Sequence, residues 1–322
     1  MPRKIFGTVL ARIAAFSLLL GACAAPAEPA PTPTETPAAT QAAQILTFTD
    51  GLGRTVSLPA PAKKIVSLAA SNTEILYAIG AGDQVVARDE FSDYPAEVLD
   101  QPSIGGSFGG YNNEAIVNLQ PDLVLAAEIN TPEQVQALES LGLTVFSLKN
   151  PSDLEEMYRN LLLVAAMTGH EAETAQLVDR LKARVARVEE KLQGVTERPL
   201  IFYELDATDP SAPYTAGAGT FIDTLINLAG GQNLGASLEG QYAQISLEEL
   251  LVQDPDVILL GDAVWGGVTA ESVASRTGWE KLRAVQDEQV HPFDDNLVSR
   301  PGPRLVDGLE AMARLLHPEL FQ

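Results

Sequence analysis

The stretch Glu171–Leu192, EAETAQLVDRLKARVARVEEKL, decides the architecture of this chain. Its apolar residues recur every three or four positions, a spacing that places them on one face of a helix. They are Val178, Leu181, Val185, Val188 and Leu192. No Gly or Pro interrupts the stretch, and at about 1.5 Å per residue the helix would be roughly 30 Å long. The sequence therefore predicts one continuous helix about as long as a small domain is wide.

A short sequence unit occurs once on each side of this helix. Before it, Asn113-Glu114-Ala115-Ile116 precedes Pro121-Asp122-Leu123-Val124-Leu125. After it, Leu247-Glu248-Glu249-Leu250 precedes Pro255-Asp256-Val257-Ile258-Leu259. In both copies the Glu stands seven residues before the Pro, and an apolar strand follows. We infer two similar lobes joined by one rigid helix.

The rest of the chain alternates strand-like and helix-like segments, which predicts an α/β fold with parallel sheets covered on both faces. We expect an N-terminal lobe at residues 45–168, a bridging helix at 169–194 and a C-terminal lobe at 195–322. A ligand cleft is expected between the lobes, where the loops at the strand C-termini converge. Ser71 and Glu74 have the spacing of a capping box at the start of a helix.

Residues 1–22 are typical of a targeting segment, because a basic start is followed by a short apolar run. The run ends in Leu20-Gly21-Ala22-Cys23, which resembles the lipobox of bacterial lipoproteins and predicts lipidation of Cys23. Plain secretion, with Cys23 incidental, is the alternative. Residues 23–44 are rich in Pro, Ala and Thr, so they predict an extended tether that holds the protein near a membrane.

Charge and histidine content restrict the partners. The chain has 21 Lys and Arg against 43 Asp and Glu, a net charge of −22, which argues against nucleic acid as a partner because binding it requires neutralising phosphates. His170, His291 and His317 lie far apart in the sequence. We therefore expect no dedicated metal site and no cofactor, although a receptor for free zinc or manganese stays open as an alternative.

Aromatic residues in polar or Gly- and Pro-rich loops are the strongest ligand signal. Each one alone is more often a packing anchor than a ligand contact. Their spread over both lobes, however, favours a cleft for a large, flat or apolar ligand. They are Phe91, Tyr94, Phe108, Tyr111, Tyr214, Tyr242 and Trp265.

Gly105-Gly106-Ser107-Phe108-Gly109 fits the pattern G-x-S-x-G and leaves a second alternative open, a secreted α/β hydrolase that uses Ser107. A nucleophile elbow needs a strand before the Ser and a helix directly after it. Gln101-Pro102 precedes this segment and Gly110-Tyr111-Asn112 follows it, so the context is wrong for an enzyme.

Glu114 and Glu248 have a local explanation, because a carboxylate in the first turn of a helix is favoured by the helix dipole. Their identical register in the two lobes favours a further role. Two carboxylates displayed in the same way could bind Arg or Lys side chains of a twofold symmetric partner.

From about Ile45 to His317 the chain resembles the substrate-binding proteins of ABC importers for ferric siderophores, haem and cobalamin. The motifs that carry the resemblance are Ile65-Val66-Ser67-Leu68, Ser71-Asn72-Thr73-Glu74, Ser92-Asp93-Tyr94-Pro95, the two Glu and Pro-Asp units, Gln244-Ile245-Ser246 and Ser299-Arg300-Pro301-Gly302-Pro303-Arg304. The resemblance implies two Rossmann-like lobes bridged by a single long α-helix. It also implies a monomeric, non-enzymatic, extracytoplasmic receptor, lipid-anchored to the cell membrane, that binds a metal chelate and delivers it to an ABC permease dimer.

The resemblance also implies roles for particular residues. In the family, one glutamate in each lobe forms a salt bridge to the permease, a role that maps to Glu114 and Glu248. Phe91, Phe108, Tyr214 and Tyr242 match positions where cobalamin binders place cleft aromatics, and Arg300 matches a cleft arginine, so ligand contacts are expected from these residues. Trp265, as a loop aromatic, and Asn296 are further expected contacts. The chain departs from those binders at Ala127 and Asn296, where they have an aromatic residue and an acid. Arg88 and Arg300 are the loop arginines available to an anionic chelate, so a neutral corrinoid is favoured over a ferric siderophore.

Overall fold

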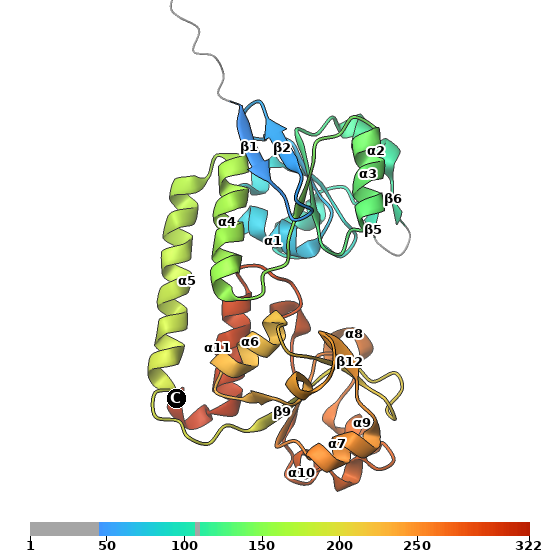
Figure 1. Cartoon of the computed structure of the whole chain (residues 1–322), viewed down its shortest axis with the longest axis vertical. Helices are drawn as coiled ribbons and strands as arrows, with labels where there is room; N and C mark the ends of the chain where they lie inside the picture. The colour runs from blue at the N-terminus through green and yellow to red at the C-terminus, as the bar shows by residue number, and fades with distance from the viewer. Residues whose placement is uncertain (1–44, 107–109) are drawn as a thin grey trace, which may run out of the picture. The chain divides into compact units, whose positions relative to one another are not determined.

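The computed structural model describes residues 45–106 and 110–322, which lie in one compact unit, Ala43–Gln322 (Figure 1). The expected targeting segment 1–22, the tether 23–44, Cys23, Ser107 and Phe108 lie outside the described residues. In the part that is described, no helix is both long enough and apolar enough to cross a bilayer.

The N-terminal lobe is built on a four-stranded parallel sheet in the order β4-β3-β7-β8. Its strands are β3 (Ile65–Ser67), β4 (Val85–Arg88), β7 (Leu123–Ala127) and β8 (Val145–Leu148). Two antiparallel pairs flank the sheet: β1 (Leu46–Thr49) with β2 (Thr55–Leu58), and β5 (Gly105–Gly106) with β6 (Gly110–Tyr111). The four parallel strands thus follow the order 2-1-3-4, as in a doubly wound sheet.

The C-terminal lobe contains a six-stranded mixed sheet in the order β12-β10-β9-β13-β14, with β11 also paired to β9. Its strands are β9 (Leu200–Asp206), β10 (Tyr214–Ala216), β11 (Gln232–Asn233), β12 (Tyr242–Gln244), β13 (Val257–Leu260) and β14 (Val290–Pro292). The parallel strands β11-β9-β13-β14 repeat the 2-1-3-4 order of the first lobe. Strands β10 and β12 are antiparallel, so the expectation of purely parallel sheets is wrong for this lobe.

Helices alternate with these strands. In the first lobe they are α1 (Ala70–Ala78), α2 (Asn113–Leu119), α3 (Pro132–Ser140) and α4 (Leu154–Thr168). After α5 (Glu171–Lys191), the second lobe has α6 (Phe221–Leu228), α7 (Leu247–Gln253), α8 (Ala263–Gly266), α9 (Ala270–Ala274), α10 (Arg283–Gln286) and α11 (Leu305–Leu316). Two α/β lobes bridged by one long helix are the predicted fold class, which is confirmed.

The bridging helix α5 packs against α4 in one lobe and α11 in the other (Figure 1). Four of its five predicted apolar residues are buried; Leu192, the C-cap residue, is partly exposed. One apolar cluster runs from the N-terminal sheet through α4 and α5 to α6 and α11. Burying a Val or Leu side chain contributes about 1.5–3 kcal/mol, so this shared core ties both lobes to the same rigid helix.

The predicted capping box at the start of α1 is wrong. The N-cap residue is Ala69, and no side chain caps the helix. Glu74 is instead buried and accepts hydrogen bonds from Arg300 and Arg304 of the second lobe. A charged side chain needs a partner when it leaves water, and here that partner comes from the distant end of the chain.

Candidate functional site

A hollow of about 570 Å³ lies between the two lobes. Its N-terminal wall follows the carboxyl ends of the parallel strands: Leu68–Ser71 after β3, Asp89 after β4, Ala127 at the end of β7 with Glu128 and Ile129 after it, and Asn150 after β8. The order 2-1-3-4 places a topological switch point between β3 and β7, the place where open α/β sheets leave a crevice for ligands. The fold thus explains why the cleft lies at this edge of the sheet.

The C-terminal wall is more aromatic. Phe221, at the start of α6, and Tyr242, on β12, line it, together with Ser299–Pro301. A smaller hollow of about 200 Å³ shares Phe221, Tyr242, Glu128 and Asn150 with the first and adds Lys149. The two hollows therefore form one continuous cleft with aromatic surface on both walls, since Phe91 faces it from the first lobe.

Asp89 is a buried carboxylate at the cleft. It accepts hydrogen bonds from the Ser92 hydroxyl and from the backbone N–H of Phe91. The Ser92 hydroxyl in turn contacts that of Thr73 at 2.7 Å. Burial raises the pKa of Asp89, although Ser92, the Phe91 N–H and Arg300 act in the opposite direction. These contacts fix the loop that carries Phe91.

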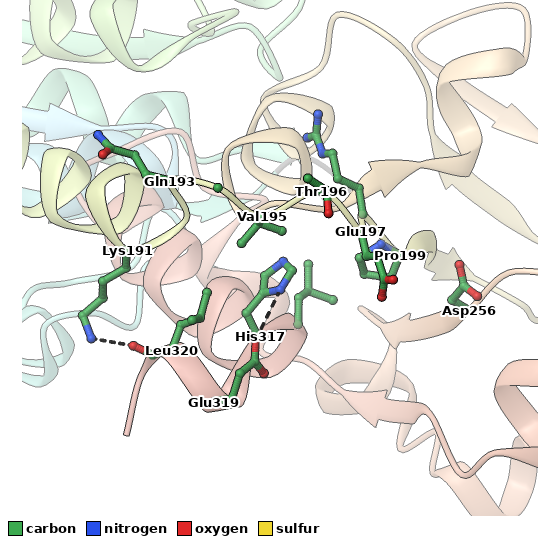
Figure 2. A pocket seen from close by; sticks show the side chains of 13 residues that line it. Lys191, Gln193, Val195, Thr196, Glu197, Pro199, Asp256, His317, Glu319 and Leu320 are labelled. Atoms are coloured by element: carbon green, nitrogen blue, oxygen red, sulfur yellow. Dashed lines mark hydrogen bonds and ion pairs between the residues drawn. The ribbon is translucent and has the colours of Figure 1, made fainter.

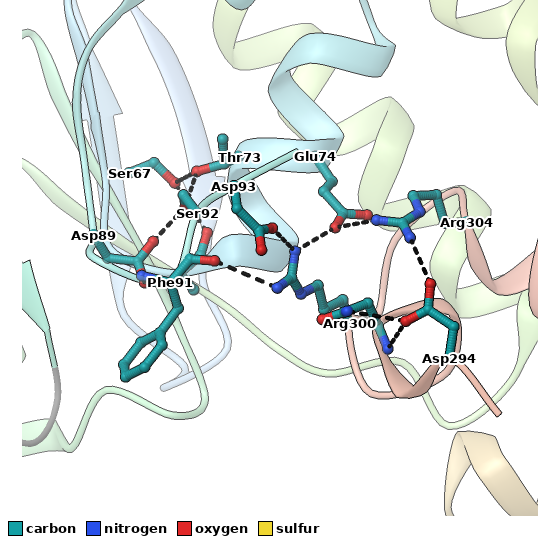
Figure 3. A network of polar contacts seen from close by, with 12 residues as sticks. Ser67, Thr73, Glu74, Asp89, Phe91, Ser92, Asp93, Asp294, Arg300 and Arg304 are labelled. Carbon is teal, nitrogen blue, oxygen red and sulfur yellow. Dashed lines mark hydrogen bonds and ion pairs between the residues drawn. The ribbon is translucent and has the colours of Figure 1, made fainter. Parts of the chain in front are cut away.

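Arg300 lines the cleft, but its charge is already satisfied (Figure 3). Its Nη1 atom lies 3.0 Å from Glu74 Oε1 and also donates to Asp93. Its Nη2 atom donates to the carbonyl oxygen of Phe91 at 3.4 Å. The guanidinium thus binds two carboxylates of the opposite lobe, and its side chain is only 13% exposed.

The cleft brings together three of the predicted ligand contacts, Phe91, Tyr242 and Arg300. Three others do not line it: Tyr214 lies exposed on β10, Trp265 lies exposed on α8, and the amide of Asn296 donates to Asp294 at 2.9 Å. Arg88, the other loop arginine, donates to the backbone carbonyls of Val98 and Asp89 instead.

The sequence interpretation missed several lining residues. Asp89, Glu128, Ile129 and Asn150 all come just after parallel strands, and Ile129 is 62% exposed. Their position at strand ends is the signal that could have identified them. Phe221 was missed because it reads as an ordinary apolar position of an amphipathic helix.

Glu114 and Glu248 occupy matching positions. Each is exposed and stands second in a seven-residue helix, α2 or α7. Asn112 and Ser246 cap these helices through their side chains. Each helix ends in a residue with left-handed backbone, after which Pro and Asp lead into a strand.

The Asp of each unit makes the same reciprocal pair of hydrogen bonds with the backbone of a neighbouring segment, here called the aspartate clamp. The backbone N–H of Lys64 donates to Asp122 Oδ2 at 2.9 Å, and the Asp122 N–H donates to the Lys64 carbonyl at 2.8 Å. In the second lobe Leu200 and Asp256 make the same two bonds, at 2.7 and 2.9 Å. The repeated sequence unit is therefore a repeated structure that displays one glutamate on each lobe.

A larger hollow, of about 860 Å³, lies at the C-terminal end of α5 (Figure 2). It is lined by the connection 193–199 and by the region of the chain around His317. It is lined by no Phe, Tyr or Trp side chain and shares no residue with the interlobe cleft. Lys191 crosses its margin to donate to the carbonyl of Leu320 at 2.7 Å. We interpret this hollow as a structural feature of the junction between α5 and the second lobe, and not as a ligand site.

The structure does not favour the two alternative functions, a hydrolase that uses Ser107 and a receptor for free metal ions. Gly105–Gly106 pairs antiparallel with Gly110–Tyr111, so the described segments on the two sides of Ser107 are paired strands and not the strand and helix that a nucleophile elbow requires. Within residues 45–106 and 110–322, no group of three or more His, Cys, Asp or Glu side chains could hold a metal ion. Neither a hydrolase nor a free-metal receptor is favoured.

Two α/β lobes, a shared bridging helix and a cleft at the strand ends define a two-lobed solute-binding protein. The sequence pattern of the family described as periplasmic binding protein matches residues 65–297. The chain is 33% identical over 282 residues to an uncharacterized ABC transporter substrate-binding lipoprotein of Bacillus subtilis, covering 86% of this chain and 87% of that protein. This chain belongs to the periplasmic binding protein family.

Solved structures agree with this assignment. The periplasmic vitamin B12-binding protein of Vibrio cholerae matches with a TM-score of 0.68 and 29% identity, over 81% of this chain and 99% of that one. A periplasmic heme-binding protein of Roseiflexus sp. RS-1 matches with a TM-score of 0.71 and 25% identity, over 80% and 99%. Members of this family bind small molecules for ABC importers, and work with a permease.

Proposed function

We propose that this protein is a lipid-anchored extracytoplasmic receptor that binds a bulky metal chelate, a corrinoid in preference to a ferric siderophore, and delivers it to an ABC permease. The observation that carries the proposal is the interlobe cleft, with Phe91 on one wall and Phe221 and Tyr242 on the other. Aromatic faces suit a large, flat macrocycle. The similarity to vitamin B12-binding and heme-binding proteins supports the same class of ligand.

The charge of the cleft favours a neutral chelate. Arg300 is the guanidinium that lines it, and Glu74 and Asp93 already bind that group. Lys149 and Glu128 line the adjoining hollow with opposite charges. A ferric chelate with several negative charges would therefore meet little uncompensated positive charge, whereas a corrinoid with peripheral amides needs only hydrogen bonds and apolar contact.

Delivery would use the two exposed glutamates. Glu114 and Glu248 stand at equivalent places on the two lobes, so they could bind arginines of two equivalent permease subunits. The anchor would be a lipid on Cys23, with residues 24–44 as the tether. We infer that the receptor acts as a monomer, since each lobe supplies one of the two contacts that a dimeric permease needs.

The proposal is tested by calorimetric titration of the full chain in detergent with cyanocobalamin, haemin and an anionic ferric catecholate. We expect saturable binding of cyanocobalamin with a Kd of about 1 μM or tighter, and affinity for the catecholate at least about tenfold weaker. Tyr242→Ala should weaken cyanocobalamin binding about tenfold. Phe321→Ala, an aromatic truncation outside the cleft, is the matched control. Absence of saturable binding to all three ligands would exclude the proposed class.

A further inference from the structure

A cluster of five charged side chains joins the two lobes beside the cleft (Figure 3). Its members, here called the Glu74 cluster, are Glu74, Asp93, Asp294, Arg300 and Arg304. Glu74 lies on α1 of the first lobe, and the two arginines come from the loop that leads into α11 of the second lobe. Every Glu74 contact in the cluster therefore crosses from one lobe to the other.

Glu74 is the centre of the cluster. Its side chain is 1% exposed, and its Oε1 atom lies 3.0 Å from Nη1 of both Arg300 and Arg304. Burial raises the pKa of Glu74, while Arg304 and Arg300 act in the opposite direction. A carboxylate that is taken out of water beside two guanidinium groups is stabilised in its charged form by them.

The two arginines face different spaces. Arg300 lines the ligand cleft, whereas Arg304 and Glu74 line a separate hollow of about 590 Å³ against α5. Glu74 does not itself line the cleft. Arg304 stacks on the Tyr94 ring, 4.2 Å from its centroid, and lies 3.8 Å from Asp294. Glu74 therefore does not face the ligand space, and Arg300 is the residue bound to it that does.

We propose that Glu74 sets the charge preference of the cleft: it is a positioning residue that neutralises Arg300 and holds its guanidinium against the wall. Asp93, which is 57% exposed, adds a second and weaker contribution to the same effect. This inference rests on the proposed function, because it assumes that the ligand occupies the cleft. Its consequence is that loss of the Glu74 charge exposes a positive charge to the ligand, so that an anionic ligand gains affinity relative to a neutral one.

Ligand pairs of nearly the same shape and different charge test this consequence. The first pair is cyanocobalamin and its monocarboxylate, in which one side-chain amide is hydrolysed; the second is haemin and its dimethyl ester. For each pair, calorimetry on the full chain gives the ratio of the two Kd values. We expect Glu74→Gln to shift that ratio about tenfold toward the anionic member, given the strength of a charge pair at a partly buried site.

Two further variants separate the charge effect from a folding defect. Asp93→Asn removes an exposed partner of Arg300, and should shift the ratio in the same direction by about two- to threefold. Asp294→Asn removes a carboxylate that pairs with Arg304 and not with Arg300, and should leave the ratio unchanged. If Glu74→Gln does not fold, the Asp93 and Asp294 variants still decide the question.

The outcomes distinguish this inference from the proposed function. A ratio that stays within twofold of the wild type in a folded Glu74→Gln variant overturns the inference alone. If that variant does not fold, a ratio in Asp93→Asn that equals the ratio in the wild type and in Asp294→Asn overturns it. Binding of the haem pair without the corrinoid pair overturns the corrinoid preference, and the ratio is then decided on the haem pair. Failure of the wild type to bind either pair overturns the proposed function, and the inference with it.

Discussion

The two lobes share one framework and differ at one edge. The strand order β4-β3-β7-β8 is repeated as β11-β9-β13-β14, and each lobe has the same glutamate-bearing helix and aspartate clamp. In the first lobe β4 is a full strand, whereas in the second β11 pairs only with the start of β9, and β10 occupies the rest of that edge. The repeated part displays Glu114 and Glu248; the edge that differs brings Tyr242 to the cleft.

This difference separates two tasks. A surface that meets a symmetric partner benefits from being the same in both lobes, whereas a surface that meets an asymmetric small molecule does not. The sequence unit is accordingly duplicated where the permease contact is proposed, and the cleft walls differ where the ligand is proposed. Substitutions in the duplicated unit should therefore affect transport by the permease, whereas substitutions in the cleft walls should affect ligand binding.

The largest effect is expected from the two glutamates of the duplicated unit. Glu114→Ala with Glu248→Ala should abolish ligand uptake by the intact transporter, because both charged contacts to the permease are lost. Each single variant should retain partial uptake. Calorimetry of the double variant should give an unchanged ligand Kd, since neither residue lines the cleft. Loss of ligand binding in the double variant would contradict the docking role, and normal uptake would do so as well.

A second difference between the lobes concerns one buried side chain at equivalent places in their sheets. Ile65 pairs with Leu123 and Ile201 pairs with Val257 at the start of equivalent strands, so Leu68 and Glu204 stand at equivalent places. Leu68 is an ordinary buried apolar residue. Glu204 is fully buried and binds Arg276 through two hydrogen bonds of 2.6 and 2.8 Å. At this place the second lobe thus contains a buried ion pair, whereas the first lobe contains an apolar side chain.

Removing one residue of the Glu204–Arg276 pair should lower the free energy of unfolding far more than replacing both residues by apolar ones. Arg276→Ala should lower the free energy of unfolding by about 3 kcal/mol, because it leaves a buried carboxylate without its cation. Glu204→Leu combined with Arg276→Leu should recover most of that loss. Urea unfolding at pH 8, where Glu204 is ionised, measures both values. Equal losses in the single and the double variant would show that packing around Arg276, which stacks on Trp279, dominates instead.

The same carboxylate predicts a pH dependence. Burial raises the pKa of Glu204 to about 7, although Arg276 acts in the opposite direction. Between pH 4.5 and 7 the folded chain then keeps a proton that the unfolded chain has lost, so stability falls as the pH rises through this range. For a chain of this size, each 1 kcal/mol corresponds to somewhat less than about 2 °C in Tm. Thermal unfolding at pH 5 and pH 8 should show this loss.

The Glu204→Leu, Arg276→Leu variant provides the control for the pH effect. It lacks the titrating group, so the part of the Tm decrease that Glu204 causes should disappear. A variant that keeps the full decrease would assign the pH dependence to other groups. This experiment sharpens the comparison of the two lobes at this one place, since the first lobe carries Leu68 there, which does not titrate.

Local patterns predicted the framework better than the site. The three- and four-residue spacing in α5 and the repeated Glu and Pro-Asp unit were enough to predict two lobes on one helix. Strands β10 and β12 were missed because each has three residues, too few to show an alternating pattern. Their pairing depends on the sheet edge that β9 offers, which no local window contains.

Glu74 shows the same limit at the site. Its spacing from Ser71 has a valid local meaning as a capping box, yet its actual partner Arg300 is 226 residues away. The Glu74 side chain could either cap its own helix or bind the distant Arg300. The tertiary contact prevailed because a buried carboxylate must be paired. Tyr242 was predicted as a ligand contact from its loop and from the family resemblance, Arg300 was predicted from the resemblance, and Phe221 was not predicted at all.

The smallest expected effects concern how the bridging helix is attached to each lobe. Lys182 pairs with Glu155 of α4 at 2.9 Å, with both side chains exposed. Arg184 binds both Asp307 and Glu310 of α11, and its side chain is 28% exposed. An isolated exposed pair contributes little, whereas a guanidinium shared by two carboxylates contributes more.

Lys182→Ala should therefore lower the free energy of unfolding by at most about 0.5 kcal/mol, and Arg184→Ala by about 1 kcal/mol. Urea unfolding measures the difference, and Lys182→Arg is the matched control because it keeps the charge. Increasing the salt concentration should shrink the Lys182 effect first, since screening acts most strongly on exposed pairs. If the two alanine variants were equally stable, the helix would be held to both lobes by its buried apolar face alone, and the ion pairs would not distinguish one lobe from the other.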